Sequence, residues 1–168
     1  PDLSVSYSDF AAWHRNFLAG PEIRSGLEFW RGQLASGPPP LDLPTDRPRP
    51  KTRGFAGGDE LFFIPRQEAD AVAALGQELG ATSFMVLLAA LEVLLWRYTG
   101  QTDLVVASPV RNRPRPEIED VIGLFTNTLM LRNRLHPAES FRELVKRVRA
   151  VTLDAFTHQE VPFDLLAQ

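Results

Sequence analysis

The sequence predicts an α/β fold in which helices pack on a mixed sheet. Five segments carry apolar residues at the spacing of an amphipathic helix. Three other segments have the apolar alternation or the short apolar run that is typical of strands. The two kinds of segment are interspersed along the chain, and such an order favours a sheet covered by helices.

The first part of the chain is expected to hold two helices and an extended crossover. Aromatic and aliphatic residues recur at helical spacing over residues 8–18 and 22–35. The next stretch, residues 37–53, is rich in proline, which cannot donate a hydrogen bond to a sheet. We therefore expect it to cross the surface in an extended form. Its arginines and lysine are better explained by a solvated linker than by an anion site.

The middle of the chain predicts a strand followed by two helices. Residues 59–64 have the apolar and aromatic content of a strand. A helix over residues 66–79 should end at Gly80 in a left-handed cap. The next helix, residues 83–98 with Thr82 as its N-cap, is apolar almost all round. We expect such a helix to be buried in the core.

The last part of the chain predicts two strands and a helix. Residues 104–107 are continuously apolar, which is typical of a strand at the centre of a sheet. Residues 124–135 alternate between two faces, as a strand does. A helix over residues 141–157 has one apolar stripe, and Ser140 and Glu143 have the spacing of a capping box.

Composition argues against several classes of function. A formal net charge of −3 over 168 residues argues against a nucleic-acid binder. The absence of cysteine excludes disulfides and thiolate metal sites, and it is compatible with a reducing cytoplasm. The longest apolar run, residues 84–91, is shorter than the roughly 20 residues that span a bilayer. The chain begins with Pro1 and not with a methionine, and the residues up to Gln168 carry no helix-stop signal. We therefore expect the chain to be a fragment.

The three histidines offer little to a metal or to acid–base chemistry. None has the i, i+4 spacing of a helical metal pair, so we expect no metal site. His158 is the best candidate for a general base, because Glu160 and Asp164 are near it in the sequence. We favour a structural role for His158 at the end of a helix, where an imidazolium suits the helix dipole.

Three separated segments, residues 7–14, 122–132 and 158–164, carry aromatic, glycine, asparagine and proline residues in a distinctive order. The distinctive positions are Tyr7, Asp9, Trp13, Gly123, Phe125, Asn127, Thr128, Arg132, His158, Gln159, Pro162 and Phe163. This ordered set resembles the motifs of condensation domains of nonribosomal peptide synthetases, and residues 108–113 also resemble a feature of that family. The sequence departs from the family pattern mildly, with His14 in place of glutamine and Thr126 in place of valine.

The resemblance implies a fold similar to chloramphenicol acetyltransferase, in which two α/β sandwich lobes form a V with a substrate tunnel between them. The family's His-His-x-x-x-Asp-Gly motif lies upstream of the first segment, and this sequence contains no adjacent pair of histidines. We therefore expect residues 1–168 to be the C-terminal lobe of a condensation domain. Such a lobe would hold no catalytic residue and would be inactive alone.

The resemblance also implies the chemistry and the partners. A condensation domain joins aminoacyl and peptidyl thioesters into a peptide bond, in antibiotic or siderophore biosynthesis in the cytoplasm. The substrates are carried on the phosphopantetheine of upstream and downstream peptidyl carrier proteins, so the lobe itself should bind no cofactor. The expected partners are these carrier proteins, the N-terminal lobe and an adjacent adenylation domain, without nucleic acid or membrane. An epimerisation or heterocyclisation domain, and a non-catalytic module that recruits a carrier protein or a tailoring enzyme, remain alternatives.

Four residues are candidates for the tunnel wall: Ser108, Arg113, Asn127 and Thr128. A buried amide without partners costs about 1–3 kcal/mol, so Asn127 must bond to the backbone, to another side chain or to a ligand. A structural hydrogen bond and a place near the reacting thioester are equally open. For Arg113 we favour a salt bridge with a carboxylate of residues 117–120. The other motif residues are expected to be structural, with Asp9 capping the first helix.

Overall fold

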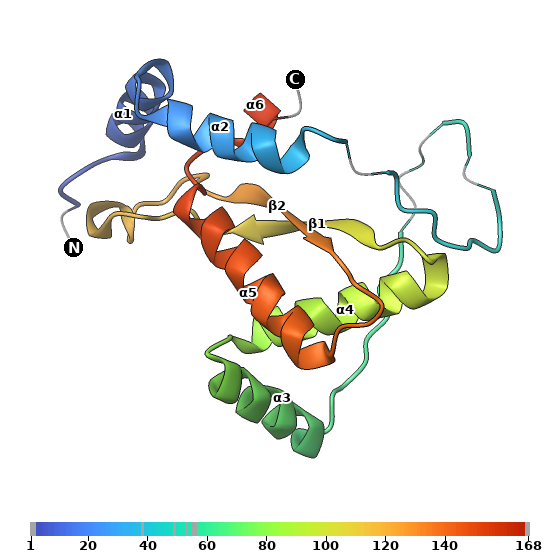
Figure 1. The fold of residues 1–168 in the computed structure, drawn as a ribbon. Coiled ribbons are helices and arrows are strands. Elements are labelled where there is room, and N and C mark those ends of the chain that lie inside the picture. The colour runs from blue at the N-terminus through green and yellow to red at the C-terminus, as the bar shows by residue number, and fades with distance from the viewer. Residues whose placement is uncertain (1–2, 38, 49, 53, 55–56, 167–168) are drawn as a thin grey trace. The chain divides into compact units, whose positions relative to one another are not determined.

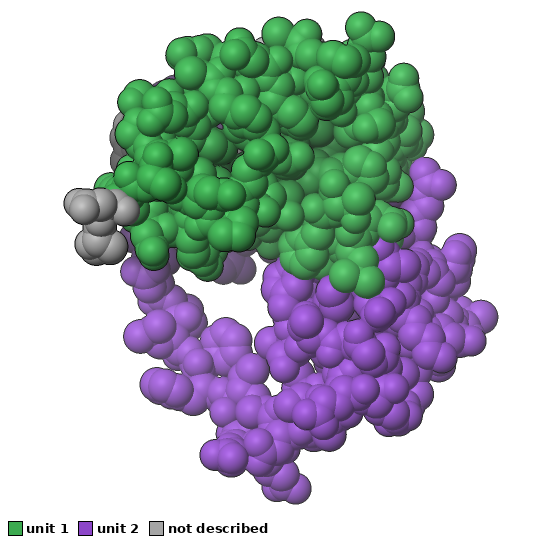
Figure 2. All heavy atoms as spheres, turned by 90° about the vertical axis from the view of Figure 1, so that its left-hand side faces the viewer, with its two compact units in different colours: residues 1–38, 105–133, 151–168 green, residues 39–104, 134–150 purple. Residues whose placement is uncertain are grey.

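The computed structural model describes residues 3–37, 39–48, 50–52, 54 and 57–166 of the chain. The chain divides into two compact units, which Figure 2 shows in different colours. Unit 1 comprises residues 1–38, 105–133 and 151–168, and unit 2 comprises residues 39–104 and 134–150.

Among the described residues, four α-helices come first, two strands separated by a short 3₁₀ helix follow, and two α-helices come last (Figure 1). This mixture of helices and strands agrees with the α/β class. Two strands form one sheet, in which β1 is the neighbour of β2. The elements in order are α1 (Tyr7–Ala19), α2 (Ile23–Leu34), α3 (Arg66–Leu79), α4 (Ser83–Thr99), β1 (Asp103–Val110), the short 3₁₀ helix η1 (Pro116–Ile118), β2 (Asn127–Arg134), α5 (Phe141–Thr157) and α6 (Phe163–Leu166).

Helix α1 begins at a capping box. The Ser6 hydroxyl accepts a hydrogen bond from the Asp9 backbone N–H at 3.3 Å, and the Asp9 carboxylate accepts one from the Ser6 backbone N–H at 2.9 Å. These bonds satisfy amide groups that the first turn of a helix leaves without partners. The Ser6 hydroxyl also donates to the Asp9 carboxylate at 2.6 Å. This bond, together with the one from the Ser6 N–H, favours the ionised carboxylate and holds the pKa of Asp9 below its ordinary value.

Helix α2 packs closely on the segment that follows α5. Trp30 is 1% exposed, and its indole N–H donates to the His158 carbonyl at 3.0 Å. At Gly26 a Cβ atom would lie 2.6 Å from a methyl group of Val161, so a larger residue would push the helix and the segment apart. These two positions fix where residues 158–161 lie within unit 1.

In unit 2, two helices meet at a tight turn. Gly80 ends α3 with φ 63°, and Thr82 caps α4 by accepting from the Met85 N–H at 3.3 Å. The predicted caps of both helices and the bounds of α3 are therefore confirmed, and α4 extends one residue beyond its predicted end at residue 98. At the start of α5, Arg142 pairs with Glu78 of α3, and this hydrogen-bonded guanidinium lowers the pKa of the Glu78 carboxyl.

The proline-rich crossover is tethered by one side chain. Gln101 accepts a hydrogen bond from the Asp42 N–H at 2.8 Å and donates to the Pro40 carbonyl at 3.0 Å. The described residues of the stretch form no helix or strand, as expected for a crossover. Three of its residues, numbers 38, 49 and 53, lie outside the part of the chain that the structure describes.

The strand predicted over residues 59–64 is wrong. These residues belong to neither strand of the sheet, and the side chains of Leu61, Phe62 and Phe63 are 85%, 80% and 92% exposed. Apolar and aromatic residues suit a strand, but a strand also needs a hydrogen-bonding neighbour, and β1 pairs with β2 instead.

Full burial of α4 is also wrong. Its buried apolar residues are Met85, Val86, Leu88 and Ala89. A second row, at alternating spacings of three and four residues, is 41–65% exposed and consists of Phe84, Leu87, Leu91, Leu94 and Tyr98. The strand predicted over residues 124–135 begins only at Asn127, and the short helix α6 was not predicted.

Within the described residues, no single helix has the length and apolarity to cross a membrane. Helices α3 and α4 meet that test only as a pair, and the pair is bent by 105°.

Candidate functional site

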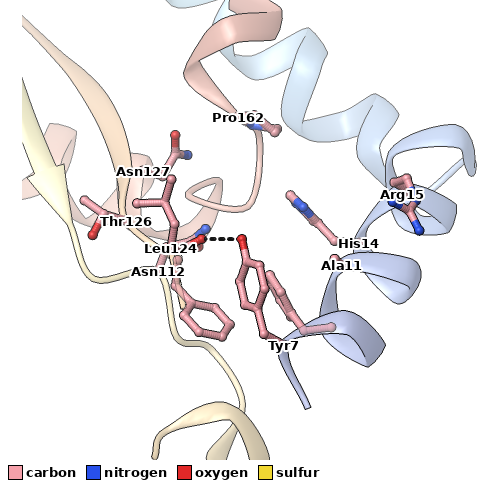
Figure 3. A pocket seen from close by; sticks show the side chains of 11 residues that line it. Tyr7, Ala11, His14, Arg15, Asn112, Leu124, Thr126, Asn127 and Pro162 are labelled. Carbon is pink, nitrogen blue, oxygen red and sulfur yellow. Dashed lines mark hydrogen bonds between the residues drawn. The ribbon is translucent and has the colours of Figure 1, made fainter. Parts of the chain in front are cut away.

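The three motif-bearing segments meet at one pocket in unit 1. The pocket has a volume of about 270 Å³. Figure 3 shows α1 on one side of it and the segment before β2 on the other, with Pro162 at its rim. The lining residues are Tyr7, Phe10, Ala11, His14, Arg15, Asn112, Leu124, Phe125, Thr126, Asn127 and Pro162.

Aromatic side chains of α1 form one wall. The Tyr7 hydroxyl donates a hydrogen bond to the Leu124 carbonyl at 3.1 Å, which the dashed line in Figure 3 marks. The rings of Tyr7 and Phe10 lie with their centroids 5.4 Å and 4.6 Å from that of Phe125. The His14 ring stacks on Phe10 at 5.4 Å. This packing links α1 to the glycine-containing segment before β2.

Gly123 permits that contact. A Cβ atom at residue 123 would lie well inside the van der Waals contact distance from atoms of the Tyr7 ring, which approaches the backbone here. A side chain larger than hydrogen would therefore displace Tyr7 and open the wall of the pocket.

Asn127, the first residue of β2, holds the third motif segment through its side chain. Its side-chain N–H groups donate to the carbonyls of Gln159 at 2.8 Å and Val161 at 2.7 Å. Its side-chain oxygen accepts from the Phe163 backbone N–H at 3.0 Å. The structure thus shows structural bonds from Asn127 to the backbone, and Asn127 also lines the pocket, so a place near the reacting thioester stays a prediction. The clamped loop places Pro162 at the pocket.

Arg113 makes hydrogen bonds to carbonyls in place of the expected salt bridge. Its guanidinium donates to the Ile118 carbonyl and, at 3.0 Å, to the Glu119 carbonyl, and lies 4.0 Å above the Phe125 ring. Arg111 is the residue that pairs with the Glu119 carboxylate. One guanidinium nitrogen of Arg113 donates to both carbonyls at the end of η1, so the backbone and not a carboxylate is its hydrogen-bond partner.

The other tunnel candidates lie apart from this pocket. Ser108 in β1 and Thr128 in β2 are both half-buried and do not line it. The motif residue Arg132 is 7% exposed and donates to the Gln33 carbonyl at 2.7 Å and the Ser36 hydroxyl at 2.8 Å. Arg132 thus fastens the end of α2 to β2.

His158 has local partners that fix its ring. Its Nδ1 lies 2.8 Å from the Asp154 carbonyl, and its ring stacks on Phe29 with the centroids 4.0 Å apart. Its carbonyl accepts the indole N–H of Trp30. Trp13 packs within the aromatic row of α1, with its centroid 5.8 Å from that of Phe10.

Asn112 lines the pocket but was not among the candidate residues, although it lies within the family-like segment of residues 108–113. It has φ 49°, in the left-handed region that asparagine tolerates better than most residues. Its side-chain oxygen is shielded from solvent and has no hydrogen-bond partner. Asn112 also lines a second cavity of about 350 Å³, together with Val110, Arg111, Arg113, Phe156 and Gln159. The sequence signals for it were its place within residues 108–113, which resemble a feature of the family, and its position directly after a strand.

The described residues contain no group of three histidine, aspartate or glutamate side chains that could hold a metal ion. The pocket offers aromatic walls, amides, the Tyr7 hydroxyl, the His14 imidazole and the exposed guanidinium of Arg15. The aromatic and amide groups suit the shaping and positioning of an elongated ligand.

Comparisons with known proteins agree on one family. The family model for condensation domains matches residues 1–168. One polypeptide of the linear gramicidin synthase of Brevibacillus parabrevis is 44% identical over 165 residues, which are 98% of this chain and 2% of that protein. Malpinin synthetase of Mortierella alpina is 42% identical over 166 residues, which are 99% of this chain and 2% of that protein. Across the first curated relatives, the chain spans 2% to 15% of their length.

Solved structures show the fold. The X-domain from teicoplanin biosynthesis, in its complex with OxyB, is 30% identical with a TM-score of 0.89 over 99% of this chain and 39% of that one. The first condensation domain of the CDA synthetase is 23% identical with a TM-score of 0.79 over 98% of this chain and 36% of that one. The fold is thus of the chloramphenicol acetyltransferase type, as the sequence resemblance implied.

Proposed function

This chain belongs to the condensation-domain family, and on that premise we propose that it is the C-terminal lobe of a domain that forms peptide bonds in a nonribosomal peptide synthetase. In this proposal the lobe shapes the substrate tunnel and offers a docking surface for carrier proteins. The reacting thioesters are carried on phosphopantetheine, and the lobe binds no cofactor of its own.

One observation carries the proposal. Three segments that are far apart in the sequence, each with family motifs, line a single pocket. Asn127 holds the third segment in place with three hydrogen bonds, and Tyr7 joins the first segment to the second. If the three motif segments served only to preserve the hydrophobic core, they would not need to meet at a cavity.

The reaction requires little covalent chemistry from this lobe. The acceptor amine attacks the carbonyl carbon of the donor thioester, the C–N bond forms, the C–S bond breaks, and the amine proton is passed on while the thiol leaves. Holding the two thioesters close together supplies much of the rate enhancement. Proton transfer is assigned to a histidine of the N-terminal lobe, because the family's His-His-x-x-x-Asp-Gly motif lies upstream of residues 1–168.

A second candidate is a non-catalytic module that recruits a tailoring enzyme. The observation that favours it is the similarity to the teicoplanin X-domain, which was solved in complex with OxyB. An intact His-His-x-x-x-Asp-Gly motif in the upstream lobe would favour condensation, and a degenerate one would favour recruitment.

The test is a condensation assay with the complete domain, including the upstream lobe in its natural reading frame. Aminoacyl-loaded and peptidyl-loaded carrier proteins are mixed with it, and the carrier-bound product is measured by mass spectrometry. We expect a new amide on the acceptor carrier with the complete domain and none with residues 1–168 alone. An inverted stereocentre or a heterocycle in place of the simple amide would assign the domain to epimerisation or heterocyclisation. Product from the 168-residue chain alone would refute the proposed division of labour.

A further inference from the structure

Two asparagines line the same pocket, and they differ in how their amides are satisfied. Asn127 uses both its N–H groups and its oxygen in bonds of 2.7–3.0 Å. The side-chain oxygen of Asn112 is shielded from solvent but accepts no hydrogen bond. An acceptor left unsatisfied in this way costs about 1–3 kcal/mol, so proteins retain it where it has a use.

The backbone at Asn112 also indicates a specific requirement. Among the described residues, Asn112 is the one non-glycine residue with a positive φ, at 49°. Backbone conformations that are sparsely populated cluster at ligand-binding and active sites. Asn112 lies where the chain leaves β1 at Val110, directly before Arg113.

The position of Asn112 between two cavities defines the shape of its ligand. It lines the 270 Å³ pocket at the motif segments and the 350 Å³ cavity beside Arg113. An elongated molecule that occupies both cavities would pass this residue. The acceptor oxygen of Asn112 requires a donor on that molecule.

The charges around the second cavity favour a neutral ligand. Arg111 is paired with the Glu119 carboxylate, and Arg113 is engaged by two carbonyls and by the face of Phe125. Neither guanidinium is left to attract an anion. A chain of methylene groups interrupted by secondary amides fits both the aromatic walls and the unsatisfied acceptor oxygen of Asn112.

We propose that Asn112 is a positioning residue, whose side-chain oxygen accepts a hydrogen bond from a secondary amide N–H of the thioester-bearing chain. This inference rests on the proposed function and adds a residue to it. The amide could come from the pantetheine arm of a carrier or from the peptidyl group itself, and the substrates chosen below distinguish these sources.

The test uses the complete domain with Asn112→Gly, Asn112→Asp and the control Asn16→Ala. Glycine adopts the positive φ without strain, so Asn112→Gly removes the side chain and leaves the backbone path intact. Aspartate also tolerates this conformation and keeps an acceptor oxygen. Asn16 is an exposed residue of α1 that does not line either cavity.

Kinetics are measured with donors presented on pantetheine and on an alkyl thiol of equal length without amides. For the pantetheine donor we expect Asn112→Gly to raise KM about 3- to 10-fold, with kcat within about twofold of the unmodified domain, as the loss of one hydrogen bond predicts. Asn112→Asp should recover most of this loss, and Asn16→Ala should show none. The melting temperature of Asn112→Gly should not fall, because the deleted amide oxygen has no partner within the protein.

The two sources of the amide give different patterns. If the amide belongs to pantetheine, the effect of Asn112→Gly disappears with the alkyl thioester. If it belongs to the peptidyl group, the effect persists with the alkyl thioester and disappears with a depsipeptide donor that has an ester in place of the amide. Either pattern supports the inference.

Three results would overturn it. Equal KM values for Asn112→Gly and the unmodified domain with every donor would remove the proposed contact while leaving the proposed function in place. A clear loss of melting temperature in Asn112→Gly would show that the side chain serves the fold. Absence of any amide product from the unmodified domain would refute the proposed function, and the inference would fall with it.

Discussion

Two segments that both carry strand-favouring apolar residues have opposite environments in this molecule. In β2, Leu129 and Leu131 are each 1% exposed, and the strand has β1 as its neighbour. In the extended segment of residues 61–64, three successive apolar side chains are at least 80% exposed. The first segment therefore contributes hydrophobic free energy to folding, whereas the second contributes almost none.

The comparison shows that strand-forming residues need partners on two sides. β2 has a hydrogen-bonding neighbour in the sheet, and its leucine side chains are buried. Its first residue, Asn127, also has three polar bonds to residues 159–163. Residues 61–64 have neither kind of partner among the described residues, although their composition favours a strand equally well.

The largest expected effect tests this comparison directly. Leu129→Ala should destabilise the protein by about 2–5 kcal/mol, because it leaves a cavity at a fully buried site. Phe63→Ala removes a larger side chain, yet its effect should stay within about 0.5 kcal/mol because that side chain is exposed. Urea denaturation of both variants measures the difference. A similar loss in the two variants would show that residue 63 is buried in solution.

The second-largest expected effect on stability concerns the side-chain hydrogen bonds of Asn127 in β2. Asn127→Ala removes three hydrogen bonds and leaves two carbonyls and one N–H of residues 159–163 without their partner. We expect a loss of roughly 2–4 kcal/mol in unfolding free energy, from about 0.5–1.5 kcal/mol for each bond. Asn16→Ala, at an exposed position, is the matched control in the same denaturation experiment. Equal stability of the two variants would contradict the clamp.

Local signals explain which parts of the fold could be predicted. The ends of α3 and α4 follow from Gly80 and Thr82, and the start of α5 follows from the Ser140–Glu143 capping box, in which Glu143 accepts from the Ser140 N–H at 2.7 Å. Each of these interactions joins residues three or four positions apart. Secondary structure that depends on them is therefore readable from the sequence.

Interactions between distant residues explain what could not be predicted. The partners of Asn127 are 32 to 36 residues away, so its sequence neighbours do not identify them. The carbonyl partners of Arg113 depend on the turn at η1, and sequence reasoning proposed a carboxylate instead. The pocket itself was not predicted, because it needs α1 to lie beside the segment before β2.

A smaller effect tests whether the wall of the pocket depends on a close approach. Gly123→Ala would force a methyl group into the Tyr7 ring, and overpacking of this kind costs about 1–3 kcal/mol. In a Tyr7→Ala background the same substitution should cost almost nothing, because the ring is gone. A double-mutant cycle of denaturation free energies measures this coupling. Equal costs in both backgrounds would show that residue 123 acts independently of Tyr7.

The smallest effect concerns the capping box of α1, which is exposed and therefore contributes little compared with the buried clamp of Asn127. The Ser6 bonds lower the pKa of Asp9, so the carboxylate stabilises the folded state above the ordinary pKa of aspartate. This contribution is lost as pH falls through the lowered pKa, when the carboxylate takes up a proton. Denaturation midpoints followed from about pH 5 to about pH 2 should fall less steeply in Asp9→Asn than in the unmodified protein. Because asparagine has no proton to gain, identical slopes in the two proteins would show that the Asp9 carboxylate has the same pKa in the folded and unfolded states.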